Sequence, residues 1–441
     1  MGKGLHFTPF RLTALTYFVL ILLGTILLML PMATADLESM LFIDAFFTAT
    51  SAVCVTGLIV QDTATYFSPF GQGVILALIQ LGGLGIMTLY AALPILFGRQ
   101  MKSSHRTTFG ELFDTDSYRS LRRILVHIVQ YTFLIESIGA ALLSLRFFLL
   151  WGDLQKALCF GIFHAVSAFC NAGFALFTTG LIQFSGDSAI NLIIMMLIIL
   201  GGIGFVTLQE FFFKKSFRKL SSHSKLVLMS TAILIFVPSF LVFHIEYLHA
   251  FSGMDLSDKV FASFFQVIAT RTAGLNTVDI SSLHMTTLFL FCILMFIGAA
   301  PGGTAGGVKT TTVGILFLSL RSIFKGQSDI ECFHKRVPSQ VVTKAIAVIS
   351  VSFSVVTLFT LMLTLTEKGS FLEIFFEVLS AFGTVGLSLG ITAKLSVFGK
   401  VLISIVMLVG RVGSLTLIFL LGGIQTSSST RRYTEGKFFV G

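Results

Sequence analysis

The chain has 441 residues, of which 55% are hydrophobic and only 12% are charged. Soluble domains carry about 25% charged residues, so this composition excludes an ordinary soluble protein and indicates an integral membrane protein. The net charge of +9 does not point to nucleic acid, because the basic residues stand between apolar stretches, where they set membrane topology.

Eight apolar stretches are long enough for membrane helices, which need about 20 residues. They cover residues 12–31, 72–97, 124–150, 188–213, 226–249, 285–320, 341–365 and 397–423. Between the two members of each consecutive pair lies another apolar stretch that is too short to cross a membrane. These four stretches, 43–52, 158–169, 260–270 and 371–382, are predicted to be re-entrant helices that enter the membrane and return.

The basic residues predict the orientation. Most of the 30 Lys and Arg residues lie at the two termini or in the connections after the second, fourth and sixth spans. Basic connections stay in the cytoplasm, so we expect a multi-pass protein of the cytoplasmic membrane with both termini inside. Most of the charged residues in the connections on the opposite side are Asp and Glu, and their negative charge would concentrate cations at the outer face.

A four-fold internal repeat runs through the chain. Its register is set by Gly57, Gly173, Gly274 and Gly386, and each glycine has a Phe ten residues before it and an Ala five residues before it. The predicted fold class is therefore an all-α membrane protein of four tandem units around a pseudo-fourfold pore, each unit made of a helix, a pore helix, a loop and a second helix. The expected boundaries are 1–98, 99–214, 215–325 and 326–425, followed by a cytoplasmic tail at 426–441.

The loops that contain these glycines predict the chemistry. Irregular backbone at membrane depth is tolerated only when it is buried in protein or lines a water-filled cavity. Carbonyl oxygens in such a loop can replace the hydration shell of a cation, and glycine permits backbone angles that other residues rarely adopt. The candidate filter residues are Val55, Thr56, Gly57, Asn171, Ala172, Gly173, Thr272, Ala273, Gly274, Thr384, Val385 and Gly386.

Two basic residues interrupt the repeat in the second helices, where other copies carry glycine. Arg411 replaces the glycine found at 83 and 202, and Lys309 replaces the glycine found at 85 and 204. A charge in a membrane segment normally faces a cavity or pairs with another charge. We expect a positive barrier just inside the filter, and the alternative is an ion pair with Glu136 or Glu210. The second-helix glycines themselves are interpreted as sites of close helix contact.

The third unit is longer than the others because of the segment 298–307, which holds one proline and five glycines. Such a composition cannot continue a helix. We interpret it as an unwound gate across the pore, and the alternative is a static kink. The candidate gating residues are Gly302, Gly303, Thr304, Gly306, Gly307, Lys309 and Arg411.

Arg271 stands inside the third candidate filter loop, where a positive charge beside a cation path is unfavourable. We expect its side chain to point away from the path and to brace the loop against a carboxylate. Glu377 and Glu373 are both candidates for that carboxylate.

Taken together, these segments resemble the Trk/Ktr/HKT superfamily of K+ transporters over essentially the whole chain. The resemblance is carried by residues 55–58, 170–174, 270–274 and 380–387, by the gate-like run 300–312 and by the Gly-Arg-Val-Gly run 410–413. The eight spans and the tail at 432–441 favour its KtrB-like membrane subunits. Gly303 and Ser414 depart from the residues that many relatives carry there, serine and proline, which puts the gating kinetics in doubt more than the ion type.

The resemblance implies K+ uptake driven by the membrane potential, in many members with Na+ dependence. It implies K+ binding at Gly57, Gly173, Gly274 and Gly386. All four loops of this chain hold glycine, whereas sodium-preferring relatives carry serine in the first loop, so the resemblance favours K+ over Na+. The implied partners are a second copy in a homodimer, the lipid bilayer and a cytosolic KtrA-like ring that binds nucleotides. K+ is the transported ion, Na+ is the second candidate ion, and no organic cofactor is expected in this chain.

The alternative within transport is a secondary cation/H+-coupled transporter, which usually has two repeats and midplane carboxylates. An enzyme would need a metal-binding motif or a nucleophile with its base, and the sequence has neither. The five cysteines form no C-x-x-C pair. A structural or lipid-scaffolding protein would show no ion dependence and would tolerate loss of Gly57.

Overall fold

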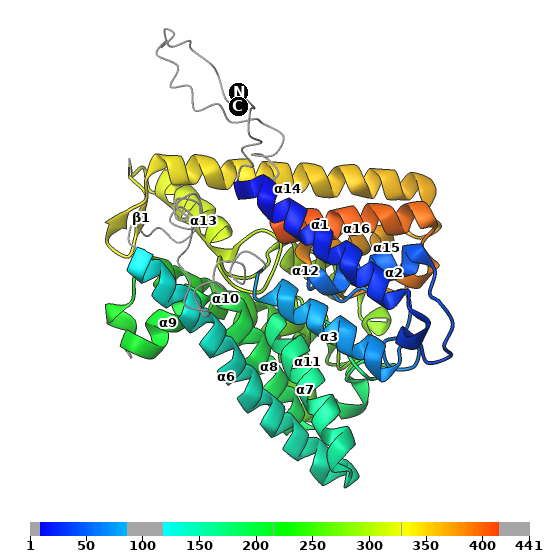
Figure 1. Ribbon diagram of the computed structural model, residues 1–441. Helices are drawn as coiled ribbons and strands as arrows, with labels where there is room; N and C mark the ends of the chain where they lie inside the picture. The colour runs from blue at the N-terminus through cyan, green and yellow to red at the C-terminus, as the bar shows by residue number, and fades with distance from the viewer. Residues whose placement is uncertain (1–8, 86–117, 215, 328, 414–441) are drawn as a thin grey trace.

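The computed structural model describes residues 9–85, 118–214, 216–327 and 329–413 (Figure 1). Helices dominate these ranges, so the predicted all-α class is confirmed. The strands found in them form one short ribbon, in which β1 (Glu331–Cys332) pairs antiparallel with β2 (Lys335–Arg336). The predicted tail at 426–441 and the ends of two predicted spans, 86–97 and 414–423, lie outside the described residues.

The helices fall into four consecutive groups. The first holds α1 (Pro9–Leu28), α2 (Phe42–Val53) and α3 (Pro69–Gly83), and the second holds α6 (Tyr118–Trp151), α7 (Leu154–Cys170), α8 (Ser188–Gly202) and α9 (Phe205–Lys214). The third holds α10 (Ser222–Glu246), α11 (Leu256–Ala269), α12 (Met285–Phe296) and α13 (Thr310–Phe324). The fourth holds α14 (Ser339–Thr366), α15 (Phe371–Gly383) and α16 (Val397–Val412). Short 3-10 turns lie at Pro31–Ala33, Ile182–Phe184, Phe217–Lys219, Ile280–Ser282 and Thr392–Lys394.

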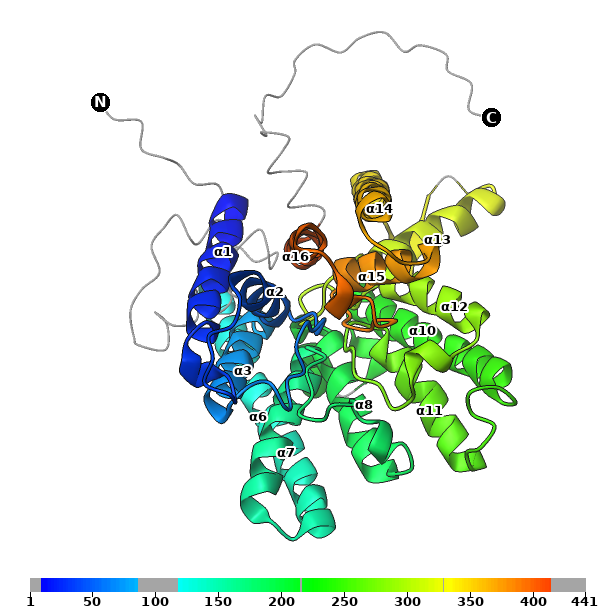
Figure 2. The same ribbon diagram turned by 90° about the vertical axis from the view of Figure 1, so that its right-hand side faces the viewer.

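These groups surround a common centre in chain order (Figure 2). The helix that follows each loop packs against the short helix of the next group: α3 against α7, α8 against α11, and α12 against α15. The last group then meets the first, because α16 packs against α2. The arrangement is therefore a closed ring of helices.

The predicted spans agree with the helices only in part. By length and composition, three single helices of the described residues could cross a membrane, namely α10, α14 and residues Val126–Trp151 of α6. The predicted span 188–213 is bent by 104° between α8 and α9, because Gly204 takes a left-handed backbone with φ of +90°. The predicted span 285–320 is two helices, α12 and α13, separated at the predicted break. All four predicted short helices are present.

The repeated positions of the sequence are the tightly packed ones. The four in-register alanines, at 52, 168, 269 and 381, are completely buried. The second-helix glycines pack against the ends of the short helices: a Cβ built on Gly82 would lie 2.0 Å from the carbonyl oxygen of Val53, and one on Gly201 1.9 Å from that of Phe169. Close helix contact is thus confirmed for these glycines.

A buried ion pair joins the first and last groups. Lys400 of α16 donates to Asp44 of α2 over 2.6 Å, and both side chains are largely buried. Removal of one partner of a buried pair leaves an uncompensated charge, which costs about 3–5 kcal/mol. We therefore expect Lys400→Met to lower the melting temperature of the purified chain clearly.

The double variant Asp44→Asn/Lys400→Met should recover most of that loss, because it leaves no buried charge behind. Lys368→Met is the matched control, since Lys368 is exposed and should be neutral. Thermal unfolding of the four proteins in one detergent measures the effect. Equal melting temperatures for Lys400→Met and Lys368→Met would show that the pair contributes nothing.

Candidate ion-binding site

The short helices α2, α7, α11 and α15 each end in a loop that turns at one of the in-register glycines. We call residues 53–57, 169–173, 270–274 and 382–386 the four glycine loops. In each loop the glycine has a left-handed backbone, and so does the residue two positions before it: Val55, Asn171, Thr272 and Thr384. A non-glycine residue in this conformation costs about 1–3 kcal/mol and persists where the surroundings enforce it, often at functional sites.

This backbone pattern orients the carbonyl groups. The residue between the two left-handed positions is Thr56, Ala172, Ala273 or Val385, and it is not left-handed. In an ordinary extended chain successive carbonyls point to opposite sides. A chain that alternates left-handed and ordinary residues can instead turn successive carbonyls toward the same side, and all four loops share this alternation.

The four glycine loops contact one another in a closed ring. A Cβ built on Gly57 would lie 2.5 Å from the carbonyl oxygen of Ala172, and one on Gly173 would lie 3.1 Å from that of Ala273. A Cβ built on Gly274 would lie 2.2 Å from the carbonyl oxygen of Val385. One built on Gly386 would lie 2.2 Å from the carbonyl oxygen of Thr56, which closes the ring. Each loop glycine therefore abuts the carbonyl that precedes the next loop glycine. The twelve candidate filter residues are all brought together here.

Serine side chains hold three of the loops. Ser51 Oγ accepts from the backbone N–H of Gly57, and Ser380 Oγ accepts from that of Gly386, both over 3.0 Å. Ser167 Oγ instead donates to the carbonyl of Phe174 over 2.6 Å. The third loop has Ile268 at this position. Sequence reasoning missed these serines, although their recurrence six residues before the glycines was a readable signal.

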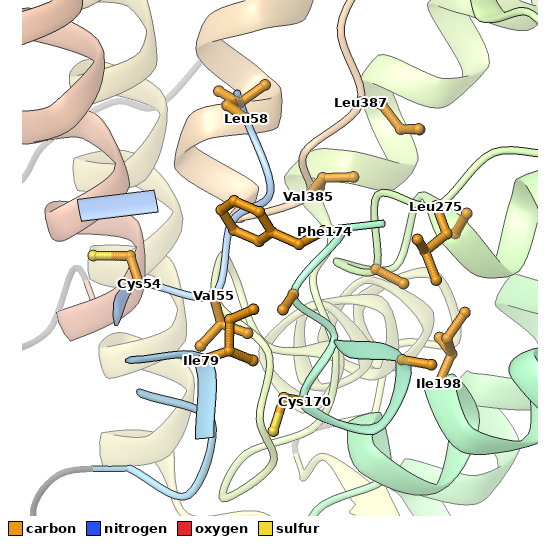
Figure 3. Close-up of a cluster of buried hydrophobic side chains, with 14 of the residues drawn as sticks. Cys54, Val55, Leu58, Ile79, Cys170, Phe174, Ile198, Leu275, Val385 and Leu387 are labelled. Atoms are coloured by element: carbon orange, nitrogen blue, oxygen red, sulfur yellow. The ribbon is translucent and has the colours of Figure 1, made fainter. Parts of the chain in front are cut away.

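The side chains behind the loops form one buried cluster. The residue that follows each loop glycine, namely Leu58, Phe174, Leu275 and Leu387, is at most 2% exposed. Figure 3 shows these side chains gathered with Val55, Val385, Ile79 of α3 and Ile198 of α8. Tight packing of this kind gives the loops little freedom to widen.

The ring has the chemistry of a site for a small bare cation. Its oxygens are backbone carbonyls, and the described residues contain no group of three or more His, Cys, Asp or Glu that could hold a metal ion. The negative ends of the four short helices adjoin the loops, which favours a cation over an anion.

The 298–307 segment lies against the glycine loops and the helices around them. The N–H of Ala300 donates to the carbonyl of Gly202, and the N–H of Thr304 donates to that of Gly201. Thr304 Oγ1 donates to the carbonyl of Phe169 in the second loop, and the N–H of Gly306 donates to Thr384 Oγ1 in the fourth. Thirteen non-helical residues separate α12 from α13, so the predicted break in the helix is present as an unwound segment.

Arg411 and Lys309 bind backbone carbonyls. Arg411 donates to the carbonyls of Thr304 and Gly82, which ties the 298–307 segment to α3. Lys309 Nζ donates to the carbonyl of Ala305 over 2.6 Å. The alternative of an ion pair with Glu136 or Glu210 is wrong. Gln80 donates to Glu136, whereas Lys214 and the N–H of Ser221 donate to Glu210.

The expected brace between Arg271 and a carboxylate is also wrong. The buried guanidinium of Arg271 donates from Nη2 to Thr231 Oγ1 of α10 over 3.3 Å. Glu377 accepts from Ser388 and Thr392, so it ties α15 to the chain that follows the fourth loop. Glu373 forms the capping box of α15 with Ser370. Each carboxylate is thus satisfied within its own group of helices.

The chain is similar to known cation transport proteins over nearly its whole length. The family model TrkH, described as a cation transport protein, matches residues 8–428. Ktr system potassium uptake protein B of Bacillus subtilis (strain 168) is 38% identical over 441 residues, which cover 100% of this chain and 98% of that protein. Potassium/sodium uptake protein NtpJ of Enterococcus hirae is 36% identical over 445 residues, with 98% and 97% covered.

The fold has a solved counterpart. The crystal structure of the potassium transporter TrkH from Vibrio parahaemolyticus superimposes with a TM-score of 0.73 at 21% identity. The match covers 95% of this chain and 86% of that one. At this identity the likeness concerns the fold.

Proposed function

This chain belongs to the TrkH family of cation transport proteins and to its KtrB-like branch, and from this premise we propose that it takes up K+ through a pore between the four glycine loops. The observation that carries the proposal is the closed ring in which each loop glycine abuts the carbonyl oxygen before the next. Oxygens held around one centre can replace the water around a cation. The names of the two similar uptake proteins favour K+ as that cation.

We propose that the twelve candidate filter residues form the selectivity filter and that K+ binds at the level of Gly57, Gly173, Gly274 and Gly386. Support comes from the shared backbone pattern of the loops and from the ring of contacts. In this proposal the four groups of helices are four tandem units with the boundaries expected from the sequence. The ring order of helix contacts, which closes from α16 to α2, favours it.

We further propose that the 298–307 segment is the gate, with Lys309 and Arg411 as its positive barrier. Support comes from its position, because hydrogen bonds join it to the second and fourth glycine loops and Arg411 joins it to α3. The segment is held by individual hydrogen bonds to the glycine loops and to α8, α9 and α16, not by a helix of its own. Such a segment can open without unfolding the ring of helices.

The proposed setting is the cytoplasmic membrane, with both termini in the cytoplasm and a homodimer as the working unit. The exposed basic residues of the β1–β2 ribbon favour a cytoplasmic position for that end of the molecule. A cytosolic nucleotide-binding ring is the proposed regulator, as the resemblance implies. Na+ dependence is supported by the name of the Enterococcus protein.

The test is ion uptake by the purified full chain in liposomes. We expect uptake of K+, or of radioactive Rb+ as its substitute, when an inside-negative potential is imposed, and weak competition by Na+. Heat-unfolded protein is the control. Uptake that ignores the potential or prefers Na+ would contradict the proposal, and so would absence of uptake both alone and with a nucleotide-binding ring subunit.

A further inference from the structure

A groove of about 470 Å³ lies between α3, α6 and α7, and none of the glycine-loop residues lines it. Its walls are mostly apolar and include Leu76, Ala77, Phe133 and Ile162. Phe133 is 52% exposed and Ile162 is 45% exposed, so the groove is open at the outer surface of these helices. That surface faces lipid in a membrane protein of this composition.

A carboxyl group stands in this apolar groove. Glu136 lies in the stretch of α6 that is long and apolar enough to cross a membrane, and it is only 4% exposed. Its two oxygens share one donor, Gln80 Nε2, at 3.1 Å each, and the thiol of Cys170 lies 3.6 Å away. No ion pair with Glu136 is found in the described part of the chain.

In this environment the carboxyl group of Glu136 receives fewer hydrogen bonds than it can accept. An ionised carboxylate has about four lone-pair sites for hydrogen bonds, and an ionisable group within a membrane usually marks a functional site with a partner. The protein supplies only the amide and the thiol. The groove therefore offers acceptor capacity for a donor that comes from outside the chain.

The same group adjoins the proposed filter. Cys170 is the last residue of α7, and the second glycine loop continues directly from it to Gly173. Cys170 is also wedged against α3, since a Cβ built on Gly83 would lie 2.4 Å from its sulfur. A ligand that draws Glu136 toward the groove would alter the contact with Cys170, and the loop has little room to absorb the change.

We propose that this groove binds a membrane-dissolved hydrophobic amine, with its ammonium group at Glu136 and Gln80 and its chain along the apolar walls. The opposite charge of the carboxylate selects an ammonium, whose N–H groups match the free acceptor sites. A bare metal ion fits less well, because the groove offers few oxygen ligands. Occupancy lowers ion flux through the contact with Cys170, a consequence that rests on the proposed function.

Binding is tested without transport, by labelling the full chain in liposomes with dicyclohexylcarbodiimide. The carboxyl O–H adds across one C=N bond, and the adduct rearranges to an N-acylurea without a leaving group. We expect peptide mass spectrometry to find the label on Glu136. N,N-dimethyldodecylamine, a tertiary amine that the activated carboxyl group cannot convert to an amide, should prevent the labelling at least tenfold better than dodecanol. Equal protection by the alcohol would mean that the groove takes only an alkyl chain, which would overturn the proposal.

The effect on flux is tested on the same liposomes. Dodecylamine should inhibit Rb+ uptake by the wild type at a concentration at least tenfold lower than it needs for Glu136→Gln, whereas Glu210→Gln should behave as the wild type. Ala77→Phe fills the groove and keeps the carboxyl group, so it should lose the inhibition even if Glu136→Gln does not insert. Equal inhibition of all variants would overturn the coupling. Protection of Glu136 without any Rb+ uptake, both alone and with a nucleotide-binding ring subunit, would keep the site and refute the transport function.

Discussion

Deletion of residues 299–304 is expected to raise K+ uptake by at least tenfold in liposomes that contain this chain alone. The deletion removes the hydrogen bonds of the 298–307 segment to Gly201, Gly202 and Phe169. Each such bond contributes about 1 kcal/mol. Loss of all three would shift the balance between a closed and an open pore by roughly 150-fold.

The geometry permits this deletion without displacement of the helices. The two ends of the excised stretch already meet, because a Cβ built on Gly298 would lie 2.1 Å from the carbonyl oxygen of Gly306. The N–H of Gly298 also donates to the carbonyl of Val308 over 2.9 Å. Rejoining Gly298 to Ala305 therefore closes a short loop at its base.

Two controls make this experiment decisive. Arg411→Gln should raise uptake in the same direction, since Arg411 ties the segment to α3, whereas Phe317→Ala, on an exposed face of α13, should leave uptake unchanged. Melting temperatures would show whether each variant is folded. Unchanged or lower uptake by a folded deletion variant would refute the gate.

Replacement of the loop glycines is expected to abolish the preference for K+ in a defined order. Gly274→Ala and Gly386→Ala should be the most damaging, because their new Cβ atoms would lie 2.2 Å from the facing carbonyl oxygens. Gly57→Ser or Gly57→Ala should follow, because the new Cβ would lie 2.5 Å from the facing carbonyl oxygen. Gly173→Ala should be the mildest, because there the same distance is 3.1 Å. Ordinary carbon–oxygen contact needs more than 3 Å, so the first three must push the next loop outward.

The ratio of K+ to Na+ uptake in liposomes measures this series. A displaced carbonyl no longer fits the ion, and a drop of about tenfold in the ratio corresponds to only 1.4 kcal/mol of lost discrimination. Gly152→Ala is the matched control, since Gly152 is also left-handed, with φ of +70°, but a Cβ there would meet no atom within 4 Å. A series in which Gly173→Ala is the most damaging would contradict the ring.

The features that could be predicted from the sequence are of two kinds: motifs repeated in all four groups of helices, and breaks caused by local amino-acid composition. The four glycine loops were predictable because the same glycine, alanine and phenylalanine stand in register four times, and packing demands small residues at those points. The break at 298–307 was predictable because proline and glycine destabilise a helix wherever they occur. Neither inference needed knowledge of distant contacts.

The failures concern partners that only the folded chain brings together. Arg411 binds two carbonyls, and a backbone carbonyl leaves no trace in the choice of side chain at that position. Arg271 binds the hydroxyl of Thr231, 40 positions away, where a carboxylate was expected. The sharp bend at Gly204 was missed because residues on both sides of it are apolar. Hydropathy reports how apolar a segment is and contains no information on the direction of its helix axis.

The contact between α16 and α2 has a consequence for how the protein is made. Asp44 and Lys400 stand 356 positions apart, yet their pair and the packing of these two helices close the ring. Until the ribosome has delivered the fourth group, the first group has no neighbour on one side and the oxygen of Thr56 has no Gly386 to meet. An unfinished chain therefore lacks one side of the ring of glycine loops, so the site proposed for K+ is complete only at the end of synthesis.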